Sequence, residues 1–300
     1  MTGPAVYWHL YRCESHRSPA RTFELGRELV RAGMNVRRDL DSECDVAMLM
    51  DFESWESFED AVVRDKDYRR AKRIDRPLAV AAYVWDMYPV KMTEDRWRRY
   101  ARFLKRHADR ILVPNRGTAF RVAEYVGHPS NGTHVVPVGV DLDDFPLLPR
   151  RDPPYVLETV RDYPWDERND WCGRACAEVG VEHRRVGGHL PDEEYKSLVA
   201  EAAVAVSSVR EASTGGMALI EASVCGVPVV VPDDEPMNWN GATYTVSSLD
   251  IRPVVRFQTY EGLVESIRAA LRLDRVVNTE LLRQYSSAAF ARRLVDVVVP

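Results

Sequence analysis

Short apolar runs alternate with amphipathic segments along most of the chain. Residues 78–84 (LAVAAYV) form a continuous apolar run, which predicts a strand that is buried on both faces. Residues 94–107 instead carry apolar side chains at spacings of three and four, which predicts an amphipathic helix. The same reasoning predicts further strands at 5–10, 45–50, 110–113, 134–137, 155–160, 183–186, 204–207 and 227–231, and helices at 21–32, 118–125, 171–179, 192–202, 217–224 and 260–273.

Alternating strands and helices predict parallel sheets that are covered by helices on both faces. The alternation is interrupted at residues 145–155 (FPLLPRRDPPY), because four prolines are incompatible with a helix interior or a central strand. We therefore expect an α/β protein with two Rossmann-like parallel-sheet domains that face a cleft. The expected boundaries are a first domain at 1–145, a Pro-rich linker at 146–154, a second domain at 155–285, and a C-terminal helix within 286–300 that packs back on the first domain.

Composition narrows the class of protein. The 300 residues are 45% hydrophobic and 29% charged, which is typical of a globular chain. No apolar run approaches the roughly 20 residues of a membrane-spanning helix, and no secretory signal is visible, so we expect a cytoplasmic protein. The five cysteines show no framework spacing, and nothing completes a metal site around Cys172 and Cys176. We therefore expect free thiols and no metal. Periodicity leaves the oligomeric state open.

Positive charge is concentrated in the first half of a chain whose net charge is −5. Residues 96–110 hold seven Lys or Arg against one Asp, and residues 64–76 hold seven against three acidic residues. A basic surface on an acidic protein indicates an anionic partner such as a phosphate, a nucleic acid or an acidic membrane. The alternative is a solvated helix face whose long side chains cover apolar surface.

The stretch 204–233 carries the clearest chemical signal. A strand leads to a polar loop with Gly215 and Gly216, and a helix then begins at Met217. Glycines allow a close backbone approach, and the helix start presents free N–H groups to an anion. Glu221, one turn into the helix, can accept hydrogen bonds from a ribose diol. The pattern suits a nucleoside diphosphate, although an acidic residue near a helix start is also favoured by the helix dipole alone.

Four segments together resemble one family. Residues 221–230 (EASVCGVPVV) resemble the E-A-x-A-x-G-x-P-V-[VI] core of GT-B glycosyltransferases, the retaining group that uses nucleotide-sugar donors (glycosyl transferases group 1). Residues 186–198 (VGGHLPDEEYKSL), 134–145 (HVVPVGVDLDDF) and 108–115 (ADRILVPN) resemble three further segments of that family. The four occur in the family's order and cover about residues 108–231.

The resemblance implies transfer of a sugar from a UDP- or GDP-type donor to a hydroxyl acceptor, with retention and without a metal or other cofactor. Glu221 matches the glutamate that binds the donor ribose, and Arg161 matches the arginine that neutralises the donor phosphate. The lysine expected after it is Asp166 here, and Arg168 is the nearest cation. The donor-binding residues expected from the resemblance are Arg168, His189, Leu190, Ser213, Gly215, Gly216, Met217, Ala218, Leu219 and Glu221.

The sequence departs from the family pattern at three places. Ser213 occupies the position of a first glutamate, and we expect Glu211 to reach the donor sugar instead. The first loop, residues 12–21 (RCESHRSPAR), is polar and cationic where the family has glycines. Asp86, at the end of the strand at 78–84, is either a base or acceptor ligand, or a cap of the next turn. The expected catalytic residues are Asp86, Arg161 and Glu211, and the expected acceptor-binding residues are Arg12, His16, Arg98, Arg99 and Arg102.

The basic stretches favour a polyanionic acceptor. One candidate is a lipid-linked or cell-envelope glycan, reached by a basic helix at a membrane surface. The other is DNA with a hydroxymethylated base, as for phage-type enzymes of this fold. Two other functions stay open. One is a nucleotide-sugar 2-epimerase, and the other is an inactive sugar-nucleotide-binding scaffold, for which Ser213 and Asp166 are the motive.

Overall fold

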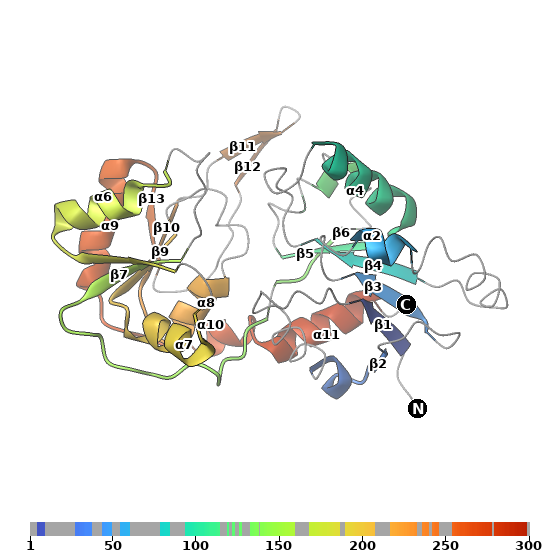
Figure 1. The fold of residues 1–300 in the computed structure, drawn as a ribbon, viewed down its shortest axis with the longest axis horizontal. Coiled ribbons are helices and arrows are strands. Elements are labelled where there is room, and N and C mark those ends of the chain that lie inside the picture. Colours follow the sequence, from blue (N-terminus) through green and yellow to red (C-terminus); the bar gives the residue numbers. More distant parts are fainter. Residues whose placement is uncertain are drawn as a thin grey trace. The chain divides into compact units, whose positions relative to one another are not determined.

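The computed structural model consists of two compact units, Met1–Gly139 with Ser287–Pro300 (unit 1) and Val140–Ser286 (unit 2) (Figure 1). Each unit is built on one parallel sheet. The structure describes residues 5–9, 28–37, 44–49, 55–60, 79–84, 94–114, 119, 122–123, 126–127, 133–137, 139–159, 168–186, 190–207, 217–232, 236–239, 242–245, 254–277 and 279–298.

The sheet of unit 1 has the order β2-β1-β3-β4-β5-β6, and every neighbouring pair of strands is parallel. Its strand β4 (Ala79–Tyr83) lies between β3 and β5, and Val80, Ala82 and Tyr83 are all buried. The prediction of a strand that is buried on both faces is therefore confirmed. The other strands are β1 (Ala5–His9), β2 (Asn35–Arg37), β3 (Val46–Leu49), β5 (Arg110–Val113) and β6 (Thr133–Val135).

Helices α2 (Trp55–Phe58) and α4 (Glu94–His107) cover one face of this sheet, and α11 (Ser287–Val298) covers the other (Figure 1). Alternate β4 side chains serve the two faces. Ala82 belongs to the core under α4, whereas the ring of Tyr83 packs edge-on against Phe290 of α11, with ring centroids 5.6 Å apart. Helix α4 has the predicted bounds and buries Tyr100 and Leu104 as its pattern indicates.

Aspartates just before β3 and β5 hold the amino ends of the strands beside them, β1 and β4. The carboxylate of Asp45, just before β3, accepts a hydrogen bond from the backbone N–H of Ala5 at 2.9 Å. Asp109, just before β5, accepts one from the N–H of Val80 at 2.7 Å. Each aspartate satisfies a backbone donor at the sheet edge, and the opposite edge receives the carboxyl ends of the strands.

Unit 2 has the strand order β13-β10-β9-β7-β8, again with parallel pairs only. Side chains that alternate along β7 enter two cores. Val156 packs with α6 and α9, whereas Leu157 packs with α7, α8 and α10. The elements are β7 (Tyr155–Glu158), α6 (Trp171–Val179), β8 (Glu182–Arg185), α7 (Asp192–Glu201), β9 (Val204–Val206), α8 (Met217–Val224), β10 (Val229–Pro232), β13 (Val254–Phe257), α9 (Tyr260–Leu271) and α10 (Thr279–Arg283).

Two helices of unit 2 end at glycines, as their sequences predict. Gly180 follows α6 with φ of 80°, and Gly226 follows α8 with φ of 71°. Both angles lie in the left-handed region, where a side chain is strained. A Cβ at Gly226 would also lie 3.3 Å from the backbone nitrogen of Val276. The Cys-Gly-Val turn before β10 therefore depends on glycine.

The Pro-rich segment at 146–154 has no regular secondary structure and is held by hydrogen bonds within unit 2. The guanidinium of Arg150 donates to the carbonyls of Leu271, at 3.0 Å, and Leu273. Arg275 donates to the carbonyls of Leu148 and Ala200, the latter at 2.6 Å. The chain enters and leaves unit 2 side by side, because Val140 and Ser286 form a parallel bridge.

Several elements were not predicted from the sequence pattern. They are β2, α2, α10, β13, and the antiparallel pair of β11 (Pro236–Trp239) and β12 (Ala242–Thr245). β2 has only three residues and α2 only four, so neither repeats its period often enough to be recognised from the sequence. Strand β7 also ends at Glu158 rather than at residue 160.

Candidate functional site

The topology of unit 2 marks one position for ligand binding. From β7 the chain passes to β8 on one side and later to β9 on the other, so the strand order reverses between β7 and β9. In open α/β sheets, ligands bind at the carboxyl ends of the strands at such a reversal. Thr159 and Ser207 directly follow these two strands, and the Thr159 hydroxyl donates to the carbonyl of Val206 at 3.2 Å.

Ser207 is a candidate that the sequence analysis missed. Its side chain is fully buried, and its hydroxyl has no hydrogen-bond partner in the described part of the chain. A buried hydroxyl without a partner is costly, so such a group often serves a ligand. The available signal was its position, directly after an apolar strand and before the loop that leads to α8.

Helix α8 brings Glu221 to this region of unit 2. The helix begins at Met217 after the loop that follows β9, and Leu219 packs in the core shared with α7. Glu221 is 1% exposed, and its Oε2 accepts a hydrogen bond of 2.5 Å from the hydroxyl of Tyr195 on α7. This bond sets the orientation of a buried carboxylate one turn into the helix. Ala218, also predicted at the donor, is half-buried at the helix start.

Tyr195 in turn is held from the segment that enters unit 2. Its ring packs edge-on against Phe145, with centroids 6.4 Å apart. The neighbouring Lys196 forms ion pairs of 2.6 Å with Asp144 and 2.8 Å with Asp192. These carboxylates raise the pKa of Lys196 despite the opposing effect of burial. Tyr195 lies within the motif at 186–198, but nothing in the sequence around it predicts this role.

Arg168, predicted to bind the donor phosphate, lies in a turn before α6. Its side chain is 1% exposed, its guanidinium carbon is 5.1 Å from the centre of the Trp171 ring, and Nη2 donates to the Gln258 carbonyl at 3.4 Å. The structure thus places this cation inside unit 2, and its role at the diphosphate stays a prediction. Leu190, half-buried before α7, packs against the same core as Tyr195.

Many predicted site residues lie outside the described residues, so their roles stay predictions. They are Arg12, His16, Asp86, Arg161, His189, Glu211, Ser213, Gly215 and Gly216, and for Met217 only the backbone is described.

A charged cluster that was not predicted surrounds the end of β7. The fully buried carboxylate of Glu158 accepts hydrogen bonds at Oε2 from Arg185, at 2.7 Å, and from His183, at 3.0 Å when Nε2 carries the proton. Possible ligand atoms of Glu158, His183 and Cys172 lie within 4.8 Å of one another. These residue types can bind zinc. However, the guanidinium of Arg185 already contacts the carboxylate and would repel a cation, so we interpret the cluster as an ion-pair network.

The described cysteines, Cys44, Cys172, Cys176 and Cys225, are all buried free thiols. Burial, together with Glu221, raises the pKa of Cys225 to about 12, although Arg275 opposes the shift.

Because the thiolate is the reactive form, a Cys13→Ser variant should react with Ellman's reagent at pH 8 only slowly while folded. In urea all four thiols should react rapidly. Fast reaction of one thiol in the folded protein would contradict this environment.

Helix α4 presents the basic surface that the sequence predicts in unit 1. Arg98, Arg99 and Arg102 are exposed, whereas Phe103 and Leu104 face the core. Arg99 pairs with Glu56 of α2 at 3.4 Å, and its guanidinium carbon lies 5.9 Å from the centre of the Trp55 ring. The arginines therefore lie on a solvated face, and part of their charge is offset by α2.

No family model matches the sequence, and no curated protein does either. Solved structures do match. HepE from Anabaena in complex with UDP-glucose is 12% identical over 98% of each chain, with a TM-score of 0.62. The lipopolysaccharide outer core galactosyltransferase WaaB is 12% identical over 99% of each chain, with a TM-score of 0.57. A glycosyltransferase from Rickettsia africae is 10% identical over 99% of this chain and 95% of its own, with a TM-score of 0.54.

The chain has the GT-B fold. The likeness extends over nearly the whole chain, and both parallel sheets agree with the predicted α/β class. The expectation of fold that was drawn from the four motifs is therefore confirmed. Among the described residues, no helix is long and apolar enough to span a membrane.

Proposed function

We propose that the protein is a glycosyltransferase that moves a sugar from a UDP- or GDP-sugar to a hydroxyl acceptor, with retention and without a bound metal or cofactor. The observation that carries the proposal is Glu221, a buried carboxylate one turn into α8, held at 2.5 Å by Tyr195. Its helix follows the strand at the reversal of the sheet. The GT-B fold and the four motifs in register support the same function.

In this proposal, the chain supplies binding and charge stabilisation. The Glu221 carboxylate accepts hydrogen bonds from the ribose, and the backbone N–H groups at the start of α8 face the diphosphate. For retention, the acceptor oxygen bonds to the anomeric carbon on the face from which the diphosphate departs, while the bond from that carbon to the diphosphate breaks. The departing diphosphate gains charge, which the helix start and the predicted Arg161 stabilise. The predicted Asp86 takes the hydroxyl proton.

The exposed arginines of α4 support an acceptor with negative charge. A lipid-linked or cell-envelope glycan and hydroxymethylated DNA both meet this condition. With a glycan acceptor, the protein binds a membrane surface from the cytoplasmic side. With a DNA acceptor, it is associated with DNA.

The decisive experiment is a titration with UDP, GDP and ADP by calorimetry, followed by incubation of the matching labelled sugar donor with each acceptor. We expect one nucleotide to bind, and label to move to one acceptor in the presence of EDTA. Conversion of the donor to its C2 epimer would contradict transfer. Binding without any turnover would identify a scaffold, and absence of nucleotide binding would remove the proposed donor site.

Tyr195→Phe tests whether the tyrosine hydroxyl positions Glu221. A hydrogen bond to a charged group contributes about 1.5–3 kcal/mol. The variant keeps the Glu221 carboxylate and loses only its orientation, so the loss in binding should be smaller. We expect UDP to bind about fivefold more weakly. Binding of 2′,3′-dideoxy-UDP, which lacks the ribose diol, should change much less. Equal losses for the two nucleotides would mean that Tyr195 only supports the fold of unit 2. Tyr260→Phe, in the same unit, is the matched control.

A further inference from the structure

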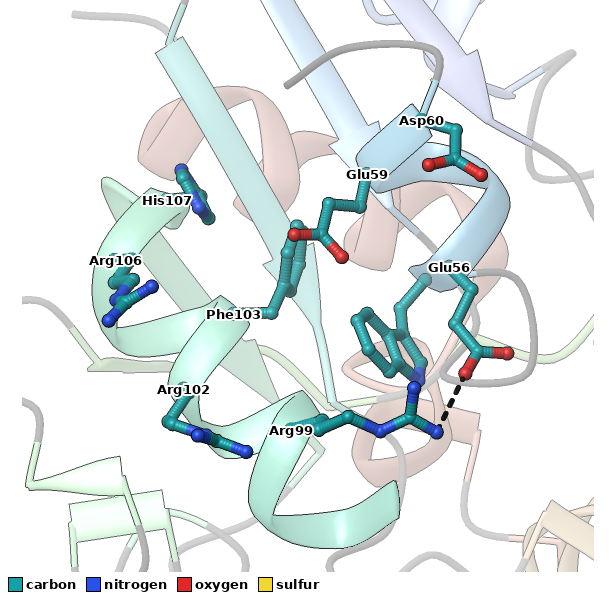
Figure 2. A pocket seen from close by; sticks show the side chains of 9 residues that line it. Glu56, Glu59, Asp60, Arg99, Arg102, Phe103, Arg106 and His107 are labelled. Carbon is teal, nitrogen blue, oxygen red and sulfur yellow. Dashed lines mark ion pairs between the residues drawn. The ribbon is translucent and has the colours of Figure 1, made fainter. Parts of the chain in front are cut away.

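A pocket of about 320 Å³ opens in unit 1 between α2 and α4. The α4 side carries Arg99, Arg102, Arg106 and His107, and the α2 side carries Glu56, Glu59 and Asp60, with Phe103 between them (Figure 2). Its volume lies at the lower end of the roughly 300–1,000 Å³ of small-molecule sites. The pocket is therefore large enough for one small ligand. Its α4 wall is cationic and its α2 wall is anionic.

The cationic wall retains charge for a ligand. Arg99 is engaged by Glu56 at 3.4 Å. In contrast, Arg102 donates to the backbone carbonyl of Arg98 at 3.2 Å. Among the described residues, no carboxylate pairs with Arg102 or Arg106. Residues 102 and 106 are one helical turn apart on the same face, so both guanidinium groups can reach one anion. Guanidinium groups suit carboxylates and phosphates through bidentate hydrogen bonds.

The opposite wall limits what that anion can be. Glu59 and Asp60 would repel an extended polyanion such as a DNA duplex, but carboxylates accept hydrogen bonds from hydroxyl groups. The indole of Trp55 lines the same pocket and is 2% exposed, and its N–H has no partner within the described residues. A buried donor of this kind can be satisfied by a ligand oxygen. The pocket thus offers cations, hydroxyl acceptors and an unused N–H.

We infer that the α2–α4 pocket binds one acidic sugar, a hexose with a phosphate or a carboxylate, as part of the glycan acceptor. The acid group lies on Arg102 and Arg106, and the hydroxyls donate to Glu59 and Asp60. The pocket lies along the two helices and reaches the last residue of α4, His107. That the bound sugar belongs to an acceptor rests on the proposed function. The pocket favours a glycan acceptor over DNA.

The test uses the full chain, saturated with whichever of UDP, GDP and ADP binds in the titration above so that the donor site is filled. It measures binding of four probes by saturation-transfer NMR and calorimetry. The probes are glucose 6-phosphate, glucuronate, glucose and inorganic phosphate. We expect both acidic sugars to bind at least tenfold more tightly than glucose or phosphate. An acidic sugar that binds no better than phosphate would show a general anion site and overturn the inference.

Variants assign the binding to the pocket. Arg102→Gln with Arg106→Gln should weaken both acidic sugars at least tenfold. Glu59→Gln with Asp60→Asn should weaken them too but leave phosphate binding equal or tighter, a pattern that loss of folding cannot produce. Lys105→Gln removes a charge from the same helix outside the pocket and should change nothing. Unchanged binding in the arginine variant would overturn the inference.

UDP affinity, measured separately for each variant, separates the two proposals. If UDP binds normally and the acidic sugars do not bind, the inference on the pocket fails while the proposed function stands. If none of UDP, GDP and ADP binds but the acidic sugars do, the pocket is a sugar site and the proposed glycosyl transfer fails. Sugar transfer to an acidic glycan that depends on Arg102 and Arg106 would support both the proposed function and the inference on the pocket.

Discussion

Replacing Glu221 by alanine is expected to weaken UDP binding by about 1–3 kcal/mol, a loss of about 5- to 150-fold in affinity. The reason is that the variant removes charge-assisted hydrogen bonds to the ribose from a carboxylate that is buried and already oriented by Tyr195. Calorimetric titration with UDP measures the effect. Product formation at saturating donor should fall less than affinity, because the ribose is remote from the reacting bond.

Glu221→Gln separates binding from packing. It keeps the shape of the side chain inside unit 2 and removes only the charge, so its loss of affinity should lie between those of the native protein and the alanine variant. Thermal unfolding of each variant controls for folding. Unchanged UDP affinity in a folded Glu221→Ala protein would remove Glu221 from the donor site and, with it, the main support for the proposed function.

Replacing Phe290 by alanine is expected to lower the free energy of unfolding of unit 1 by about 3–5 kcal/mol. Phe290 is fully buried in α11 and packs edge-on against Tyr83 of the central strand β4. Its removal leaves a cavity between the last helix of the chain and the sheet. Urea unfolding measures the loss.

The control for this second prediction is Val30→Ala, a truncation in the same unit at a side chain that is 57% exposed, which should cost little. The UDP affinity of folded Phe290→Ala should stay unchanged, because Phe290 and Glu221 belong to different units. A loss of less than 1 kcal/mol would show that α11 contributes little to unit 1.

Long or strongly patterned elements were predictable. Helix α4 and strand β5 have the predicted bounds because their apolar spacing is regular and uninterrupted. Gly180 and Gly226 likewise determine where α6 and α8 end. Strand β13 and the β11–β12 pair escaped prediction. Strands of only four residues give no clear alternation. β13 depends on its pairing with β10, whereas β11 and β12 pair with each other.

The candidate site was predictable only in part. The position of Glu221 on a helix after β9 follows from local sequence, and so does the basic face of α4. Side-chain partners that are distant in sequence do not. Tyr195 meets Glu221 from 26 positions away, and Arg185 meets Glu158 from 27. The pocket between α2 and α4 also depends on residues that are distant in sequence and come together only in the fold. In addition, α2 is too short to be predicted from its pattern.

The bridge between Val140 and Ser286 has a consequence for how this architecture can be rearranged. Residues on both sides of unit 2 belong to unit 1, so unit 2 is an insertion whose two ends are hydrogen-bonded side by side, with Val140 donating to the Tyr285 carbonyl at 2.8 Å. Closely spaced ends are the condition under which insertion of a whole domain is tolerated. We therefore expect that another Rossmann-like domain could replace unit 2 at this single junction without redesign of the sheet of unit 1.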